Sequence, residues 1–139
     1  MAARILVAMA DAPMSERALA YALETFPEAE ITVVHVVGVP TWWMAEAADI
    51  ALADDIAQAA QDRAASVFER AAAIAEEHDA DVATVVDLGH PGRAIPRRAA
   101  DFDLVVIGSH ARGLDGRILL GNVAETVTRR SPVPVTVVR

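Results

Sequence analysis

A glycine-rich segment near the end of the chain holds the residues best suited to bind a charged ligand. It spans residues 108–122, reads GSHARGLDGRILLGN, and contains four glycines, one serine and two arginines. Glycine lets backbone N–H groups converge on phosphate oxygens, and a helix that begins after such a loop adds favourable partial charge. Arg112 and Arg117 could add positive charge, although arginines in exposed loops are commonly only solvated. The pattern indicates a phosphate-binding loop, or a segment whose glycines merely turn the chain.

Residues that could carry catalysis or bind a metal are scarce. The chain has no cysteine, which excludes disulfides, thiolate zinc sites and a cysteine nucleophile, and no lysine, which excludes a Walker-type loop. Ser109 and His110 are adjacent, so their side chains point apart, and no G-x-S-x-G turn surrounds the serine. No pair of histidines has the spacing of metal ligands. The sequence therefore predicts no catalytic residue and no metal ligand. It favours structural roles for the four histidines, His35, His78, His90 and His110, among which His110 is the exception to watch because it lies in the glycine-rich segment.

Charge and hydropathy narrow the range of partners. Acidic residues outnumber basic ones by 20 to 12, and the net charge of −8 opposes binding to nucleic acid or to an anionic membrane. No apolar run is long enough to span a bilayer. The N-terminal apolar stretch leads directly into a helical pattern without a cleavable tail. We therefore expect residues 1–139 to form a single cytoplasmic domain.

The strands that must position the glycine-rich segment are short, apolar and rich in β-branched residues. Runs without polar alternation are typical of strands covered on both faces, as in a parallel sheet. The pattern predicts five strands, at Ile5–Met9, Ile31–Val37, Val82–Leu88, Leu104–Ile107 and Val133–Val138.

Helical patterns lie between these strands. The first helix is expected to start with Ser15 as its N-cap, and the second to cover at least Ile56–Glu77. A short helix is predicted over Arg93–Phe102, where Pro96 is tolerable only in the first turn. The last helix begins near Ile118 or, after a further loop turn, near Gly121. Alternating strands and helices predict an α/β fold with helices on both faces, and ligands bind beyond the carboxyl ends of such strands.

Two long segments of the sequence resemble the universal stress protein family. The run DLVVIGSHARGLDGRILLGNVAETVTRRSPVPVTVVR resembles the C-terminal third of these proteins, and ILVAMADAPMSERALAYAL with ITVVHVV resembles their first strand, helix and second strand. The likeness covers nearly the whole chain except Gly38–Asp55. It implies a Rossmann-like, adenine nucleotide alpha hydrolase-like fold, with a five-stranded parallel sheet in the order 3-2-1-4-5.

The resemblance also implies a ligand, but the motif for that ligand is incomplete. Family members that bind ATP carry a glycine, two residues, a glycine, nine residues, and a glycine followed by serine or threonine. The four positions here are Gly108, Ala111, Gly121 and Asn122, so two are changed. Ala10 stands where the family usually has an aspartate, with Asp11 one residue later. The implied ligand is ATP or another adenine nucleotide, with or without Mg²⁺, and its implied contacts are Met9, Ala10, Val36, Gly108, Ala111, Arg112, Gly121, Asn122 and Val123.

Two interpretations of the function stay open at this point. In the first, the chain is a stress-response regulator, non-catalytic or at most weakly ATP-hydrolysing, that binds an adenine nucleotide and signals to protein partners. In the second, it is a nucleotide-independent dimeric interaction protein. The resemblance implies a homodimer through the strand Val133–Val138, because family members commonly pair these strands. Trp42 and Trp43 could stack on a base or pack against a partner subunit.

Overall fold

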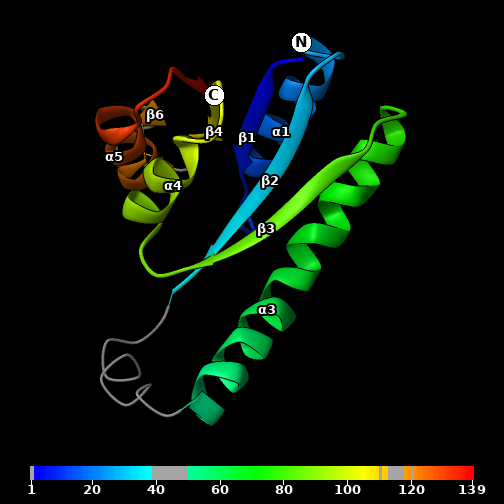
Figure 1. Cartoon of the computed structure of the whole chain (residues 1–139). Helices are drawn as coiled ribbons and strands as arrows, with labels where there is room; N and C mark the ends of the chain where they lie inside the picture. Colours follow the sequence, from blue (N-terminus) through cyan, green and yellow to red (C-terminus); the bar gives the residue numbers. More distant parts are fainter. Residues whose placement is uncertain (1, 39–49, 110, 113–117, 120) are drawn as a thin grey trace.

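Five parallel strands form one sheet in the computed structural model, which describes residues 2–38, 50–109, 111–112, 118–119 and 121–139. The sheet order is β3-β2-β1-β4-β7 (Figure 1). This order confirms the predicted parallel sheet with strands in the order 3-2-1-4-5, since β7 is the fifth strand of this sheet along the chain. The strands are β1 (Arg4–Ala8), β2 (Glu30–Val37), β3 (Val82–Leu88), β4 (Leu104–Gly108) and β7 (Val135–Val138).

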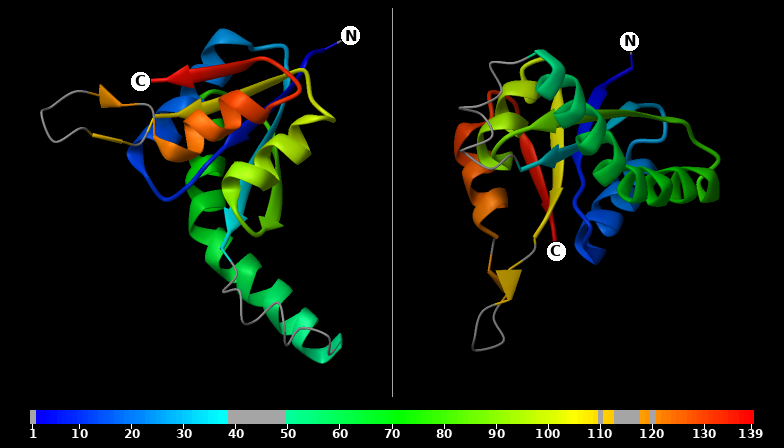
Figure 2. Two further views of the ribbon diagram at one scale, coloured as in Figure 1. Left: turned by 90° about the vertical axis from the view of Figure 1, so that its left-hand side faces the viewer. Right: turned by 90° about the horizontal axis from the view of Figure 1, so that it is seen from below.

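Helices cover both faces of the sheet, as predicted. The helices α1 (Pro13–Thr25) and α3 (Ile50–Glu77) pack on one face, and α4 (Pro91–Ala99) and α5 (Asn122–Arg130) on the other (Figures 1 and 2). Successive strand residues point to opposite faces. In β1, Ile5 and Val7 therefore join the core beneath α1 and α3, whereas Leu6 joins the core beneath α4 and α5.

Two predicted helix starts are wrong, and local hydrogen bonds explain both. Ser15 is not an N-cap: α1 begins at Pro13, and the buried Ser15 hydroxyl accepts a hydrogen bond from the Ala10 N–H (2.9 Å). The helix α4 begins at Pro91, because the Nδ1 atom of His90 accepts the Gly92 N–H (3.0 Å) and caps the helix. Pro96 consequently lies in the helix interior, not in its first turn.

The last helix begins at Asn122 with Gly121 as its N-cap, which confirms the later of its two predicted starts. The earlier start at Ile118 is wrong because β6 (Ile118–Leu119) pairs with β5 (Ala111–Arg112) in a separate antiparallel ribbon. The last strand starts at Val135, two residues later than predicted. The Ser131 hydroxyl accepts the Val133 N–H (3.2 Å) and holds that residue in a turn.

The helix α3 is 28 residues long, and its first half projects beyond the sheet (Figures 1 and 2). Within the ranges given above, no helix combines the length and the hydropathy needed to cross a bilayer. At its end, the Ala80 N–H donates to the Ala75 carbonyl (2.9 Å) and the Asp79 N–H to the Glu76 carbonyl (3.1 Å). This bonding pattern ends a helix through one left-handed residue, and Asp79 has φ 56°.

Replacing Asp79 with glycine is expected to stabilise the protein by about 1 kcal/mol, because glycine adopts positive φ without steric cost. Thermal unfolding should show a Tm higher by roughly 3 °C. The Asp79→Ala variant is the matched control, because it removes the same charge but keeps a Cβ at positive φ. Equal stabilisation by both variants would assign the effect to charge and contradict the backbone explanation.

Candidate functional site

A cavity of about 90 Å³ lies where β1 and β2 end, on the face of the sheet that α4 and α5 cover; we call it the strand-end cavity. Four of the nine predicted ligand contacts line it: Met9, Ala10, Val36 and Val123. Its other walls include Pro91 and Ile95 of α4. These two residues were not predicted, because the contacts implied by the resemblance lie at the ends of the first two strands and in residues 108–123, whereas α4 follows the third strand. The available signal was the capping segment Gly89–Gly92, which starts a helix at the same edge of the sheet.

The other predicted contacts belong to the connection between β4 and α5. Gly108 is the buried last residue of β4, and Ala111 and Arg112 form β5. Gly121 caps α5, and Asn122 is its exposed first residue. The first bond within α5 runs from the Glu125 N–H to the Gly121 carbonyl (2.9 Å). The preceding N–H groups of α5 therefore point out of the helix start beside Val123, where an anion would be favoured.

Two of the three departures from the ATP-binding pattern of the family, Ala111 and Ala10, have clear structural surroundings. Ala111 lies in an extended strand and pairs with Leu119, so a non-glycine residue causes no backbone strain there. Ala10 is exposed and lines the strand-end cavity without a charge. Among the residues that the structure describes, no carboxylate lines this cavity.

Asp11 does not replace the missing carboxylate at position 10. Its side chain is 79% exposed, and its carboxylate lies 3.5 Å from the guanidinium of Arg70 in α3. Glu16 of α1 lies 3.3 Å from the same guanidinium. Because α1 and α3 cover the opposite face of the sheet from the strand-end cavity, the Asp11 carboxylate lies toward that face and does not line the cavity.

Histidine side chains near the site have structural partners. The Nδ1 atom of His35 donates to the Met9 carbonyl (2.8 Å), which fixes the end of β1 at the cavity wall. His90 caps α4, as described above. In the part of the chain that the structure describes, no cluster of acidic residues and histidines is arranged to hold a metal ion. The predicted candidates His110, Arg117, Trp42 and Trp43 lie outside the described residues.

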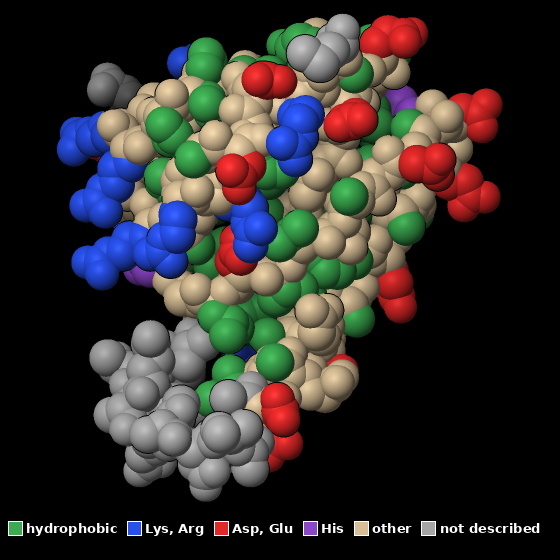
Figure 3. All heavy atoms as spheres, in the orientation of Figure 1, with side chains coloured by type: hydrophobic (Ala, Val, Ile, Leu, Met, Phe, Trp, Pro, Cys, Tyr) green, Lys and Arg blue, Asp and Glu red, His purple; other side chains and the backbone are tan. Residues whose placement is uncertain are grey.

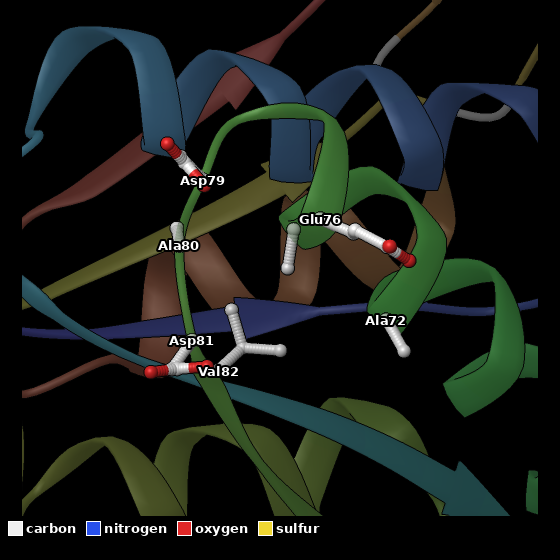
Figure 4. Close-up of a pocket in the computed structure, with 7 residues that line it drawn as sticks. Ala72, Glu76, Asp79, Ala80, Asp81 and Val82 are labelled. Atoms are coloured by element: carbon white, nitrogen blue, oxygen red, sulfur yellow. The ribbon is translucent and has the colours of Figure 1, made fainter.

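A larger hollow of about 420 Å³ lies between the end of α3 and the start of β3 (Figure 4). Its walls carry the carboxylates of Glu76, Asp79 and Asp81. These side chains point in different directions in Figure 4 and do not converge on one point. An acidic hollow at the amino end of the sheet suits neither a phosphate nor a bound cation, so it is not the candidate site.

His78 joins the ends of α3 and α1 and has a raised pKa. Its Nδ1 atom donates to the Ile74 carbonyl (2.8 Å) and its Nε2 atom to the Glu24 carboxylate (3.1 Å). Both partners only accept hydrogen bonds, so the doubly protonated ring fits both. The bond to the Ile74 backbone, followed by the bond to Glu24, raises the pKa of His78 above its ordinary value of 6.5.

Because this pKa is higher in the folded than in the unfolded chain, the contribution of His78 to stability is complete below pH 6.5 and is lost as pH rises through the folded pKa. We expect His78→Gln to lower the free energy of unfolding more at pH 5.5 than at pH 8.5. Urea unfolding at both pH values and NMR titration of the ring test this. The Glu24→Gln variant should lower the His78 pKa. A ring that titrates at or below 6.5 in the unsubstituted protein would contradict the assignment.

Comparison with known proteins gives matches across the full chain. The model of the universal stress protein family matches residues 1–139. Universal stress proteins of Mycobacterium tuberculosis and Mycobacterium bovis are each 35% identical over 138 residues, or 99% of this chain and 45% of each relative. The chain thus spans less than half the length of these curated relatives.

Solved structures of universal stress proteins share the fold. A complex with cAMP has a TM-score of 0.73 at 21% identity, covering 99% of this chain and 97% of the other. An Arabidopsis thaliana family protein with AMP bound has a TM-score of 0.66 at 16% identity, covering 98% and 90%. An Archaeoglobus fulgidus protein in complex with dAMP has a TM-score of 0.66 at 18% identity, covering 100% and 98%. With the observed strand order, they confirm the adenine nucleotide alpha hydrolase-like fold.

Proposed function

Because this chain belongs to the universal stress protein family, we propose that it is a non-catalytic regulator that binds an adenine nucleotide at the carboxyl ends of β1 and β2. The observation that carries the proposal is the strand-end cavity, an apolar hollow directly beside the open N-terminus of α5. An apolar wall next to N–H groups that make no hydrogen bond within their own helix suits a ligand with a flat base and a phosphate. The structures of relatives with cAMP, AMP and dAMP support this ligand class.

The size of the strand-end cavity indicates which part of a nucleotide would bind in it and which part would bind at the start of α5. Small-ligand pockets commonly enclose about 300–1,000 Å³, so a cavity of about 90 Å³ would take only one part of the ligand. Val36, Pro91 and Ile95 would contact the base. The N–H groups at the start of α5, next to Gly121 and Asn122, would bind the phosphates of ATP, with or without Mg²⁺.

Calorimetric titration with ATP, AMP and cAMP, with and without Mg²⁺, tests the proposal. We expect saturable heat for adenine nucleotides and a ligand-dependent increase in Tm, because a ligand that binds only the folded state stabilises it. The matched control is Val123→Phe, which places a larger side chain in the cavity wall and should abolish both signals. Absence of heat and of a Tm shift at millimolar nucleotide would overturn the proposal.

A nucleotide-independent interaction protein is the second candidate function, and the missing carboxylate at position 10 favours it. Ala10 offers no charge to the cavity, and the Asp11 carboxylate lies 3.5 Å from Arg70 and does not line the cavity. The two candidates differ in their response to nucleotide. Partner binding that is unaffected by ATP, in a protein that shows no nucleotide heat, would support the second candidate.

We also propose that the chain forms a homodimer through β7, which occupies one end of the sheet order. The Val105 N–H donates to the Pro134 carbonyl (3.0 Å) and the Ser109 N–H to the Val138 carbonyl (2.9 Å). Backbone groups alternate in direction along a strand, so those of Val135 and Val137 point away from β4. An edge of this kind can pair with the same edge of a second copy.

The Val137→Pro variant is expected to be monomeric, because proline removes the outward N–H at the centre of this edge. Sedimentation velocity at micromolar concentration should show the change from dimer to monomer. The control is Val86→Pro in β3, which makes the same substitution at the opposite edge of the sheet and should leave the dimer intact. A Val137→Pro protein that stays dimeric would refute pairing through β7.

A further inference from the structure

Five arginines gather on α4 and on the last turn of α5, and we call this group the arginine surface: Arg93, Arg97, Arg98, Arg129 and Arg130. They are five of the 12 basic residues of a chain with net charge −8. The sequence of α4 contains no acidic residue, and that of α5 contains only Glu125. Figure 3 shows arginine side chains concentrated on the side where α4 and α5 lie, with acidic side chains more numerous toward α3.

Three of these arginines have no charged partner within the described residues. Arg98 donates to both carboxylate oxygens of Asp87, with a distance of 3.0 Å from Nε to Oδ2, and Arg129 pairs with Glu125 at 2.7 Å. Among the described residues no carboxylate contacts Arg93, Arg97 or Arg130, and all three side chains are exposed. Their guanidinium groups are therefore free to bind an anion.

The arginine surface stands on a rigid pair of helices. A Cβ atom at Gly92 would lie 2.9 Å from the Cγ2 methyl of Thr126, so α4 and α5 approach closely at this point. The inner sides of the two helices, which include Ile95 and Val127, are buried in one core. Because this packing fixes the helices, it also fixes the spacing of the arginines that they carry.

The same two helices form part of the strand-end cavity. Pro91 and Ile95 of α4 and Val123 of α5 line it from the inner side, opposite the exposed arginines. A ligand in the cavity would contact the helices that hold the arginine surface. The coupling between a ligand in the cavity and the arginine surface rests on the nucleotide binding proposed above. The positive charge of the arginine surface is independent of that proposal.

The chemistry of the surface suits a short anionic segment. Guanidinium groups bind carboxylates, as they do phosphates, through two parallel hydrogen bonds. A long polyanion such as nucleic acid would also meet the field of the whole acidic chain, whereas a short segment experiences mainly the charges within about 8 Å at physiological salt. A hollow of about 200 Å³ is lined by Asp87, Leu88, Ala94, Arg97, Arg98 and Asp101. Leu88 is 45% exposed and, with Ala94, forms the apolar part of its wall, which an apolar side chain could contact; the Asp87 carboxylate is already paired with Arg98.

We propose that the arginine surface is a docking site for a short acidic segment of a partner protein, in which an apolar side chain accompanies the carboxylates. Arg93, Arg97 and Arg130 would bind the carboxylates, and the hollow beside Leu88 would take the apolar side chain. An acidic peptide suits this surface because its carboxylates would pair with the free guanidinium groups, and an apolar side chain among them would contact the exposed Leu88.

The test uses a fluorescent nonapeptide with four glutamates on each side of a leucine, titrated with the full chain by anisotropy in 50 mM salt. We expect the Arg93→Gln/Arg97→Gln/Arg130→Gln variant to bind at least about tenfold more weakly. The matched control is Arg17→Gln/Arg63→Gln/Arg139→Gln, which removes the same charge away from α4 and α5 and should lose less than about threefold. A peptide with serine in place of leucine should bind more weakly than the leucine peptide.

Several outcomes would overturn the proposal. Equal losses in the two triple variants would show that only net charge matters. Tighter binding of an oligonucleotide with eight phosphates, or of anionic vesicles, through the same arginines would assign the surface to a different partner. Docking is measured without nucleotide, so its failure is separate from a failure of ATP binding. Repeating the titration with saturating ATP tests the link between the cavity and the surface: an unchanged peptide affinity would refute that link.

Discussion

The Gly108→Ala variant is expected to lose about 3 kcal/mol of folding free energy and roughly 10 °C in Tm. A Cβ atom at position 108 would lie 2.5 Å from the carbonyl oxygen of Met14 and 2.8 Å from its carbonyl carbon. Both are backbone atoms in the first turn of α1, so they cannot rotate away as a flexible side chain would. The end of β4 and the start of α1 would have to separate to relieve the contact.

Alanine substitutions at two other glycines show whether the loss of stability comes from the close contact at position 108. At Gly38 no atom of the described residues lies within 4 Å of an added Cβ, so Gly38→Ala should leave the free energy of unfolding almost unchanged. At Gly92 the nearest atom is a side-chain methyl of Thr126, and we expect Gly92→Ala to have an intermediate cost that Thr126→Ser reduces. Chemical denaturation of the three alanine variants measures this order. A Gly108→Ala protein as stable as Gly38→Ala would contradict the packing role.

Because Gly108 is needed for packing against Met14, its presence is weaker evidence for ATP binding. The resemblance assigned Gly108 to the ligand, yet the contact with Met14 alone requires glycine at this position. Its presence is therefore compatible with a protein that has lost its ligand. The positions that distinguish the two candidate functions are those that face the strand-end cavity, above all Ala10.

The layers followed from the sequence because they depend on long apolar patterns, whereas the strand order was implied by the family resemblance. A strand such as β1, which is buried on both faces from Ile5 to Ala8, leaves a continuous run of apolar residues that does not depend on details elsewhere in the chain. The predicted starts of α1 and α4 failed because they depend on single hydrogen bonds. The Ser15 hydroxyl accepts a hydrogen bond from the Ala10 N–H across a turn. His90 caps α4, although histidine is an uncommon N-cap.

Four of the residues that line the strand-end cavity were predicted from the family resemblance and not from apolar patterns. Met9, Ala10, Val36 and Val123 were found through a family resemblance that fixes positions in the sequence. Pro91 and Ile95 were missed because an apolar residue of an amphipathic helix gives the same sequence signal whether it lines a cavity or fills the core. Only the packing of α4 beside β1 and β2 distinguishes these two cases.

The Ala10→Asp variant is expected to bind ATP roughly tenfold to a hundredfold more tightly than the unsubstituted chain. A hydrogen bond to a charged group contributes about 1.5–3 kcal/mol, which corresponds to this range of affinity. Position 10 is exposed and lines the strand-end cavity, where the described residues supply no carboxylate. The backbone at this position is already held by the bond from the Ala10 N–H to the Ser15 hydroxyl, so the new side chain is introduced at a fixed point.

Three controls identify the origin of the gain. The Ala10→Asn variant has the same shape without the charge and should recover only a small part of the affinity. The Ala111→Gly variant should change little, because Ala111 lies in the unstrained strand β5. A carboxylate that accepts a hydrogen bond from the sugar should give no gain with 2′,3′-dideoxy-ATP. If Ala10→Asp and Ala10→Asn bind ATP equally, or if the dideoxy nucleotide gains as much as ATP, the missing carboxylate is not what limits nucleotide binding by this chain.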